Sequence, residues 1–231
     1  MFFSRSRGLI FIKTKKTAGT SVEAYLEVAC DPRRWTGEWE DLHVTDGEVT
    51  HDLIVTARGD GTRRRGERSD LELNGVRLVN HMTPSRVIAA LGRDTWDSSL
   101  TVAGVRNPWD RMASMFFWSR RRDASREELL TNPEQAREAF VEFLGGWQRE
   151  QADDEIMSAD LGVDEFIRYE HLEADLGRVF ASAGIERPGI DLPRLKAGSR
   201  PEGYTWLYDD GSRARVAEIY ADMIERFGYT F

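Results

Sequence analysis

Two short segments of this chain combine residue types that bind phosphate or sulfate. The first is Lys16-Thr17-Ala18-Gly19-Thr20-Ser21, which follows an apolar segment, 8–13, typical of a short buried strand. A helical pattern begins at Ser21, so the segment is expected to join a strand to a helix. Helix N-terminal N–H groups, a small glycine, hydroxyls and the Lys16 ammonium would together bind a tetrahedral anion.

A plainer interpretation of this segment is a surface turn with a Ser or Thr cap, and the Walker A pattern G-x-x-x-x-G-K-[ST] is absent. Three of the four lysines, Lys13, Lys15 and Lys16, nevertheless fall within four positions in a chain that otherwise uses arginine. The clustering of these three lysines slightly favours a chemical role for them.

The second segment is Arg106-Asn107-Pro108-Trp109-Asp110-Arg111-Met112-Ala113-Ser114, which follows a buried-strand pattern at 99–105. Asn107 is expected to cap a helix whose first residue is Pro108. Arg106 would then end a strand, the place where open α/β sheets bind ligands. At 3.6 residues per turn one helix face carries Asn107, Arg111, Ser114 and Trp118. Its guanidinium and hydroxyl suit a phosphate, although a capped helix with a surface arginine is the plainer alternative.

Taken together, these segments resemble two motifs of the sulfotransferases that use 3′-phosphoadenosine 5′-phosphosulfate (PAPS). KTAGTS is similar to their 5′-phosphosulfate loop, and RNPWDRMAS to their R-N-P-x-x-R-x-x-S motif. The resemblance covers most of the chain and is closest to bacterial enzymes related to the carbohydrate sulfotransferases. It extends to Asn80-His81-Met82, to residues 166–172 and to Phe227-Gly228-Tyr229. Lys15 departs from it, because many members have proline there.

The resemblance implies PAPS as co-substrate, adenosine 3′,5′-bisphosphate as product, and no metal. The 5′-phosphosulfate would be held by Lys16, Thr17, Ala18, Gly19, Thr20 and Ser21. Arg106 and Ser114 would hold the 3′-phosphate, and a basic segment from Lys196 to Arg200 would close over the nucleotide. Lys16 would also stabilise charge on the bridging oxygen during transfer.

Sulfuryl transfer to a hydroxyl also needs a group that takes the proton. Related carbohydrate sulfotransferases use a histidine or a glutamate. His81 is the first choice, because it follows a strand-like segment and precedes a helix that begins with proline. His51 and Glu23 remain open as alternatives, whereas His171 has the position of a helix cap.

The pattern of elements around these segments predicts the fold. Apolar, strand-like segments occupy 8–13, 53–56, 76–79, 99–105 and 163–169. Helical patterns start at Ser21 and cover 84–92, 134–147 and 171–183, and a last helix is ended by Gly228. This alternation predicts one α/β domain over 1–231, with a central, mainly parallel sheet flanked by helices and a P-loop-like phosphosulfate loop.

Composition narrows the function classes. With 40% apolar and 31% charged residues the chain is globular, and its net charge of −8 argues against nucleic acid as a partner. No apolar run would span a membrane, no signal peptide is recognised, and Cys30 is the single cysteine, so a cytoplasmic protein is expected. No residue cluster has metal-ligand spacing.

The acceptor and the oligomeric state are left open by the sequence. A carbohydrate, a glycolipid and a small metabolite all fit as acceptors. Two rival functions share the phosphate-binding logic: an ATP-dependent, kinase-like phosphotransferase and a non-catalytic nucleotide-binding module. The first needs Mg²⁺ ligands and a Walker loop, neither of which is visible. The second would bind the donor without turnover.

Overall fold

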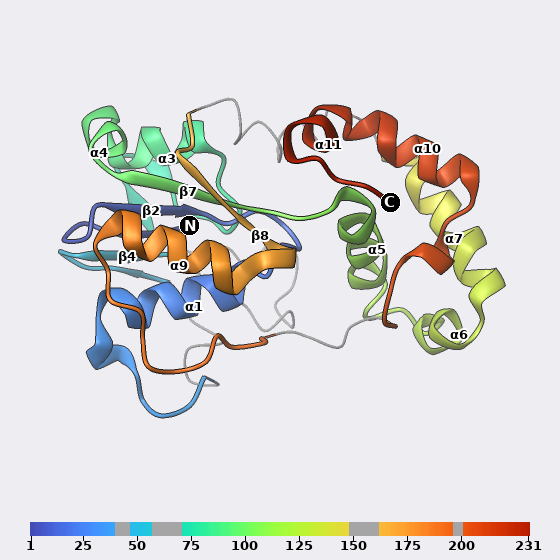
Figure 1. The fold of residues 1–231 in the computed structure, drawn as a ribbon, viewed down its shortest axis with the longest axis horizontal. Coiled ribbons are helices and arrows are strands. Elements are labelled where there is room, and N and C mark those ends of the chain that lie inside the picture. Colours follow the sequence, from blue (N-terminus) through green and yellow to red (C-terminus); the bar gives the residue numbers. More distant parts are fainter. Residues whose placement is uncertain (40–46, 57–70, 148–161, 196–200) are drawn as a thin grey trace. The chain divides into compact units, whose positions relative to one another are not determined.

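The computed structural model describes residues 1–39, 47–56, 71–147, 162–195 and 201–231. Contacts group the chain into two compact units (Figure 1), Met1–Val105 with Met157–Leu195 and Arg106–Ile156 with Lys196–Phe231. The described residues give each unit its own hydrophobic core. A single domain over 1–231 stays a prediction.

The first unit is built on a six-stranded sheet of the order β3-β4-β1-β2-β7-β8. These strands are β3 (Glu48–Val49), β4 (Leu53–Val55), β1 (Phe2–Ser4), β2 (Leu9–Ile12), β7 (Leu100–Val105) and β8 (Glu165–Arg168). The α/β class is confirmed, but the expectation of a mainly parallel sheet is wrong. Among the described strands only β2–β7 and β7–β8 pair in parallel, while β3–β4, β4–β1 and β1–β2 are antiparallel.

The antiparallel half of the sheet originates in the N-terminal strand, which the sequence patterns did not predict. Residues 5–8 join β1 to β2, with Gly8 at φ +55°, and Phe3 pairs with Ile10. A connection this short permits only antiparallel pairing, because a parallel crossover needs a dozen or more residues. Since β4 then pairs with the other edge of β1, the sheet is mixed.

Helices cover both faces of this sheet (Figure 1): α1 (Gly19–Cys30) and α9 (Leu172–Ala183) on one, α3 (Pro84–Leu91) and α4 (Arg93–Asp97) on the other. Successive strand residues point to opposite faces. Phe11 therefore packs in the core on the α1 and α9 side, whereas Ile10 and Ile12 pack in the core on the α3 side. This burial fixes β2 and α1 relative to each other.

The remaining elements of the first unit are short. They are η1 (Pro32–Arg34), β5 (Glu72–Leu73), β6 (Val76–Arg77) and η2 (Tyr169–His171). The strand expected over 76–79 is only two residues long, and it pairs with β5 in a separate hairpin rather than in the central sheet.

The second unit, in its described part, is helical. It contains α5 (Pro108–Ser119), α6 (Arg126–Thr131), α7 (Pro133–Gly145), η3 (Thr205–Leu207), α10 (Asp210–Ile219) and α11 (Ala221–Phe227). The single C-terminal helix that the sequence predicts is broken at Tyr220, whose buried hydroxyl donates to the sulfur of Met112, 3.3 Å away. Gly228, at φ +65°, ends α11 as predicted. None of the helices in the described ranges is long and apolar enough to cross a membrane.

Candidate functional site

The lysine-containing loop joins β2 to α1, as its sequence predicts, and α1 begins at Gly19, two residues before the expected start. Two non-glycine residues of the loop, Lys16 at φ +64° and Ala18 at φ +58°, adopt the left-handed conformation. Such strain costs about 1 kcal/mol or more per residue and clusters at ligand-binding sites. Ala18 gives α1 no side-chain cap, and the first turn of α1 carries no acidic residue. The positive end of this helix is thus not neutralised by its own first turn.

Two threonines hold the loop on the neighbouring strand β7. The Thr14 hydroxyl donates to the carbonyl oxygen of Gly104, 2.5 Å away, and lies 2.9 Å from the hydroxyl of Thr17. Thr17 is buried and also donates to the Thr14 carbonyl oxygen, 3.2 Å away. The hydroxyl of Thr17 is therefore used in contacts with Thr14, and in an anion site only the backbone N–H of Thr17 would bind the anion.

Ser21, in the first turn of α1, connects the loop to the segment that precedes Lys196. Its buried hydroxyl oxygen accepts a hydrogen bond from the backbone N–H of Leu195, 3.0 Å away. Lys196 and Arg200, expected to close over a nucleotide, lie outside the described residues.

Glu23, one of the three candidate proton acceptors, is fully buried on α1 between two cations. Its Oε2 lies 2.6 Å from the Lys13 ammonium, and its Oε1 lies 3.0 Å from the α-amino group of Met1. Both carboxylate oxygens therefore contact a positive charge that stabilises the ionised form. This arrangement argues against Glu23 as the proton acceptor.

His81, the first-choice proton acceptor, lies beside the end of β2. Its backbone is left-handed, at φ +59°, and its Nδ1 is 3.0 Å from the carbonyl oxygen of Lys13. Because a carbonyl oxygen only accepts, Nδ1 carries the proton and Nε2 carries the lone pair. Burial and then the nearby Lys13 charge lower the pKa of His81 to about 3. The ring is thus neutral near pH 7 with its lone pair on Nε2, but a pKa this low also makes it a weak base.

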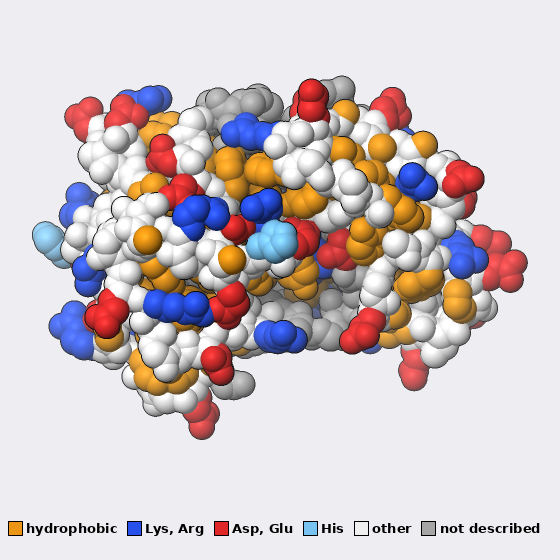
Figure 2. Space-filling view, in the orientation of Figure 1, with side chains coloured by type: hydrophobic (Ala, Val, Ile, Leu, Met, Phe, Trp, Pro, Cys, Tyr) orange, Lys and Arg blue, Asp and Glu red, His pale blue; other side chains and the backbone are white. Residues whose placement is uncertain are grey.

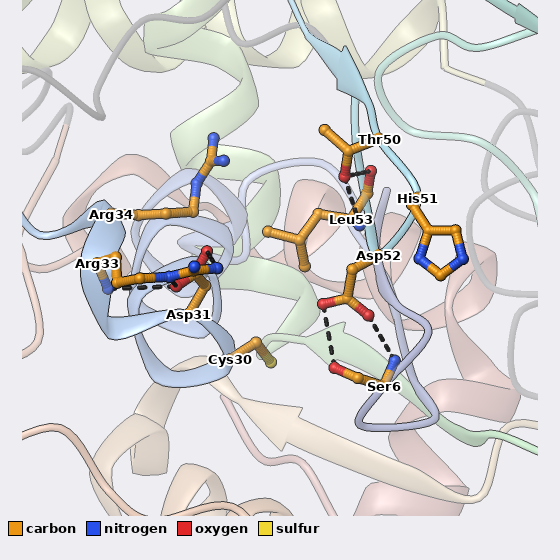
Figure 3. Close-up of a pocket in the computed structure, with 9 residues that line it drawn as sticks. All are labelled: Ser6, Cys30, Asp31, Arg33, Arg34, Thr50, His51, Asp52 and Leu53. Atoms are coloured by element: carbon orange, nitrogen blue, oxygen red, sulfur yellow. Dashed lines mark hydrogen bonds and ion pairs between the residues drawn. The ribbon is translucent and has the colours of Figure 1, made fainter.

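His51, the second choice, lies far from this loop. It is exposed and lines a pocket of about 420 Å³ at the other end of α1, next to Cys30 (Figure 3). Gly19 and Cys30 are the first and last residues of α1, so the helix separates the two places by about 17 Å at 1.5 Å per residue. The structure therefore does not bring His51 to the lysine loop.

The charged groups of that pocket are paired with one another or with neighbours. Arg33 contacts Asp31 at 2.8 Å, Arg34 contacts Glu27 at 2.7 Å, and Asp52 accepts hydrogen bonds from Ser6. Burial raises the pKa of the Cys30 thiol to about 12, so its thiolate is scarce at neutral pH. We therefore assign no chemistry to the pocket.

The other two histidines add little to the candidate site. His171 is exposed and occupies the N-cap position of α9, as expected, but its side chain makes no capping hydrogen bond. His43 lies outside the described residues.

In the second unit, the RNPWDRMAS motif begins α5 with the predicted cap. Asn107 Oδ1 accepts hydrogen bonds from the N–H groups of Trp109 and Asp110, at 3.0 and 3.4 Å. Arg106 is only 4% exposed, and its Nε and Nη2 lie 2.7 and 2.6 Å from the same oxygen, Oδ2 of Asp110. The sequence did not predict this role of Asp110, because Arg106 precedes the helix cap and the usual i, i+4 pairing rule applies to residues within a helix.

The polar face predicted for α5 is mostly buried, contrary to the interpretation of a surface arginine. Arg111 is 2% and Ser114 5% exposed. The Arg111 guanidinium lies 5.7 Å from the centre of the Tyr220 ring, and burial lowers the pKa of Arg111. Arg111 and Ser114 are therefore part of the interior of the helical unit.

Basic side chains elsewhere are mixed with acidic ones. Figure 2 shows Lys and Arg side chains interspersed with Asp and Glu on the face drawn, which agrees with the net charge of −8. Arg121 stacks on Trp118 at 4.1 Å, and Arg63–Arg65 lie outside the described residues. Within the described part of the chain, no group of three or more His, Cys, Asp or Glu side chains is arranged to hold a metal ion.

No protein-family model, no curated protein and no solved structure matches this chain. The resemblance to sulfotransferases therefore depends on the KTAGTS and RNPWDRMAS motifs alone.

Proposed function

We propose that this protein is a PAPS-dependent sulfotransferase, which moves a sulfuryl group from PAPS to an acceptor hydroxyl. One topological observation carries the proposal. Strands β2 and β7 are parallel neighbours, with Ile12 paired to Ala103, so both end at the same edge of the sheet. The lysine loop leaves β2 at this edge, and Arg106 follows β7 directly in the chain. Ligands of open α/β sheets bind at this edge.

In this proposal, two separate sets of residues would hold the two anionic ends of such a donor. Around the 5′-phosphosulfate would lie Lys16, Gly19, Thr20, Ser21 and the backbone of Thr17 and Ala18, at a helix end without an acidic first turn. Arg106, oriented by Asp110, and Ser114 would hold the 3′-phosphate. Lys196 and Arg200 would complete the nucleotide site.

In this mechanism His81 Nε2 takes the proton as the acceptor oxygen attacks sulfur in line. A bond forms between that oxygen and sulfur while the bond from sulfur to the phosphate oxygen breaks. Lys16 and the N–H groups of α1 stabilise the negative charge on the departing phosphate oxygen. The products are a sulfate ester and adenosine 3′,5′-bisphosphate.

Calorimetric titration with adenosine 3′,5′-bisphosphate tests the donor site. The titration is compared with adenosine 5′-monophosphate and with ATP, each with and without Mg²⁺. We expect binding that requires the 3′-phosphate, needs no added Mg²⁺ and weakens in Arg106→Ala. Preference for ATP with Mg²⁺ would instead identify a phosphotransferase.

Turnover is tested separately, with PAPS and a panel of hydroxyl acceptors: carbohydrates, glycolipids and small metabolites. Appearance of the bisphosphate only when an acceptor is present supports the transferase. Tight donor binding without turnover on any acceptor would favour a nucleotide-binding module. The cytoplasmic location stays a prediction.

A further inference from the structure

Lys13 connects three parts of the first unit that the proposed reaction needs together. It follows β2, the strand that ends at Ile12, and is only 3% exposed. Its side chain reaches α1, and its backbone reaches the candidate proton acceptor. The mechanism above gives this lysine no role.

The ammonium of Lys13 is anchored on α1. Its Nζ lies 2.6 Å from Oε2 of Glu23, which is itself fully buried. The stem of Lys13 packs against the first residue of α1, because a Cβ built on Gly19 would lie 2.5 Å from Lys13 Cγ. The side chain thus fills the space between the strand end and the helix start.

The backbone of the same residue holds His81. The carbonyl oxygen of Lys13 accepts the hydrogen bond from Nδ1–H of His81, at 3.0 Å. This bond sets the tautomer, and the left-handed backbone at His81 requires its surroundings to hold the residue in place. A shift of the Lys13 carbonyl oxygen would therefore lengthen or break the hydrogen bond that orients the imidazole of His81.

We propose that Lys13 is a positioning residue: its ion pair with Glu23 fixes the end of β2, and thereby the carbonyl oxygen that holds His81 with its lone pair on Nε2. Part of this inference, the effect on transfer, rests on the proposed function. The part that concerns the tautomer does not.

The energetics favour a positioning role over a purely stabilising one. Burial of an ammonium and a carboxylate carries a desolvation penalty, and apolar residues of similar volume often stabilise a fold equally well. The contact of Lys13 Nζ with Glu23 Oε2 at 2.6 Å is directional, and in this proposal its role is to fix the end of β2. The charged groups that face His81 are Lys13, the α-amino group of Met1 and Glu23.

The test compares Lys13→Met, which keeps a long stem without the charge, with Lys13→Arg, which keeps the charge. Arg178→Met is the matched control, since Arg178 pairs with the buried carboxylate of Asp175 on α9 at 2.7 Å. The Lys13→Met/Glu23→Gln double variant removes both charges and gives the same comparison if the single variant does not fold.

The first readout is independent of activity. Nitrogen-15 NMR of the imidazole rings, assigned with His81→Asn, reports the tautomer and the pKa of His81. We expect a single Nδ1–H tautomer in the wild type and in Arg178→Met, and a mixture in Lys13→Met. Loss of the Lys13 charge should also raise the pKa of His81 above its wild-type value of about 3, because that charge is one of the causes that lower it.

The second readout is kinetic. In Lys13→Met we expect kcat for sulfuryl transfer to fall about 10- to 100-fold, as for a misplaced catalytic group, while the bisphosphate Kd stays within about twofold. Lys13→Arg recovers part of the loss.

Two results overturn the proposal. One is a Lys13→Met protein with unchanged tautomer and kcat. The other is a Lys13→Met protein that loses bisphosphate affinity about tenfold at unchanged kcat, because Lys13 would then hold the donor. If the wild type neither binds the bisphosphate nor transfers sulfate, the proposed function fails, and the NMR comparison alone decides the role of Lys13.

Discussion

Gly104 on β7 and Thr17 in the lysine loop are in contact because Gly104 has no side chain. A Cβ built on Gly104 would lie 2.7 Å from Oγ1 of Thr17, closer than such atoms approach in proteins. The carbonyl oxygen of Gly104 also accepts the hydrogen bond of Thr14. A single glycine therefore determines how closely the loop lies on the sheet.

Gly104→Ala is expected to destabilise the protein by about 1–3 kcal/mol, because the added methyl group overpacks against Thr17 and displaces the loop. Thermal unfolding measures the loss. Gly177→Ala is the matched control, since Gly177 is within α9 and a Cβ there meets nothing within 4 Å. That change should raise stability by up to about 1 kcal/mol. Equal changes in stability for Gly104→Ala and Gly177→Ala would contradict a close contact between Gly104 and Thr17.

Lys16→Ala is expected to lower kcat for sulfuryl transfer about 100- to 1000-fold, the usual loss when one donor to a developing charge is removed. Steady-state kinetics with PAPS and a working acceptor measure it. Arg7→Ala, which removes an exposed cation of the same unit, should leave kcat unchanged. Near-normal turnover in Lys16→Ala would remove Lys16 from the mechanism.

Arg106→Ala and Asp110→Asn should both weaken bisphosphate binding, because Asp110 holds the guanidinium of Arg106 through two contacts to one carboxylate oxygen. A charge-assisted hydrogen bond contributes about 1.5–3 kcal/mol, which corresponds to about 10- to 100-fold in Kd for Arg106→Ala. Calorimetry should show a smaller effect for Asp110→Asn.

The control for this pair is Arg93→Ala. Arg93 and Asp97 form another i, i+4 pair, with side chains 68% and 52% exposed, so the bisphosphate Kd should not change. Affinity for adenosine 5′-monophosphate should be unaffected in all three variants. A loss of monophosphate affinity as large as that of bisphosphate affinity would contradict the assignment to the 3′-phosphate.

His81→Gln should lower kcat about 100- to 10,000-fold without changing the bisphosphate Kd, because only the proton acceptor is lost. His171→Gln, which changes an exposed ring, is the control. Since the pKa of His81 is about 3, protonation of this ring should not lower kcat between pH 5 and 8. Full turnover by His81→Gln would show that a group other than His81 accepts the proton.

The depressed pKa of His81 also predicts a pH dependence of stability. The unfolded ring takes up a proton near pH 6.5, whereas the folded ring does so only near pH 3. Between these values the unfolded state binds more protons, so the free energy of unfolding falls as the pH is lowered, by at most about 1.4 kcal/mol per unit. Above pH 6.5 this contribution no longer changes.

Urea unfolding of wild type and His81→Gln at several pH values between 4 and 7 isolates this contribution. The difference between the two proteins should shrink toward acid, as the wild type loses stability that the variant does not. His171→Gln should follow the wild type. Parallel curves for wild type and His81→Gln would mean that the folded ring titrates normally.

Local patterns in the sequence identified the elements that carry the candidate site. The apolar segments at β2 and β7, the helical periodicity of α1, the cap at Asn107 and the stop at Gly228 are confirmed. Each depends on residues within a turn or two of one another, so each can be predicted from the sequence alone. The motif residues lie in the same short segments, whereas the roles proposed for them at the two ends of a donor come from the resemblance to sulfotransferases.

Contacts between distant residues decided the rest. The mixed sheet arises because β1 pairs with both β2 and β4, and no local pattern specifies which strands become neighbours. From the sequence, Glu23 is a candidate for the proton acceptor. In the structure its carboxylate is paired with the Lys13 ammonium, 2.6 Å away, a contact that no local pattern predicts. Likewise, His81 gains its tautomer from a carbonyl 68 positions away. Burial and long-range pairing set the charge and orientation of such groups, and only the tertiary structure specifies them.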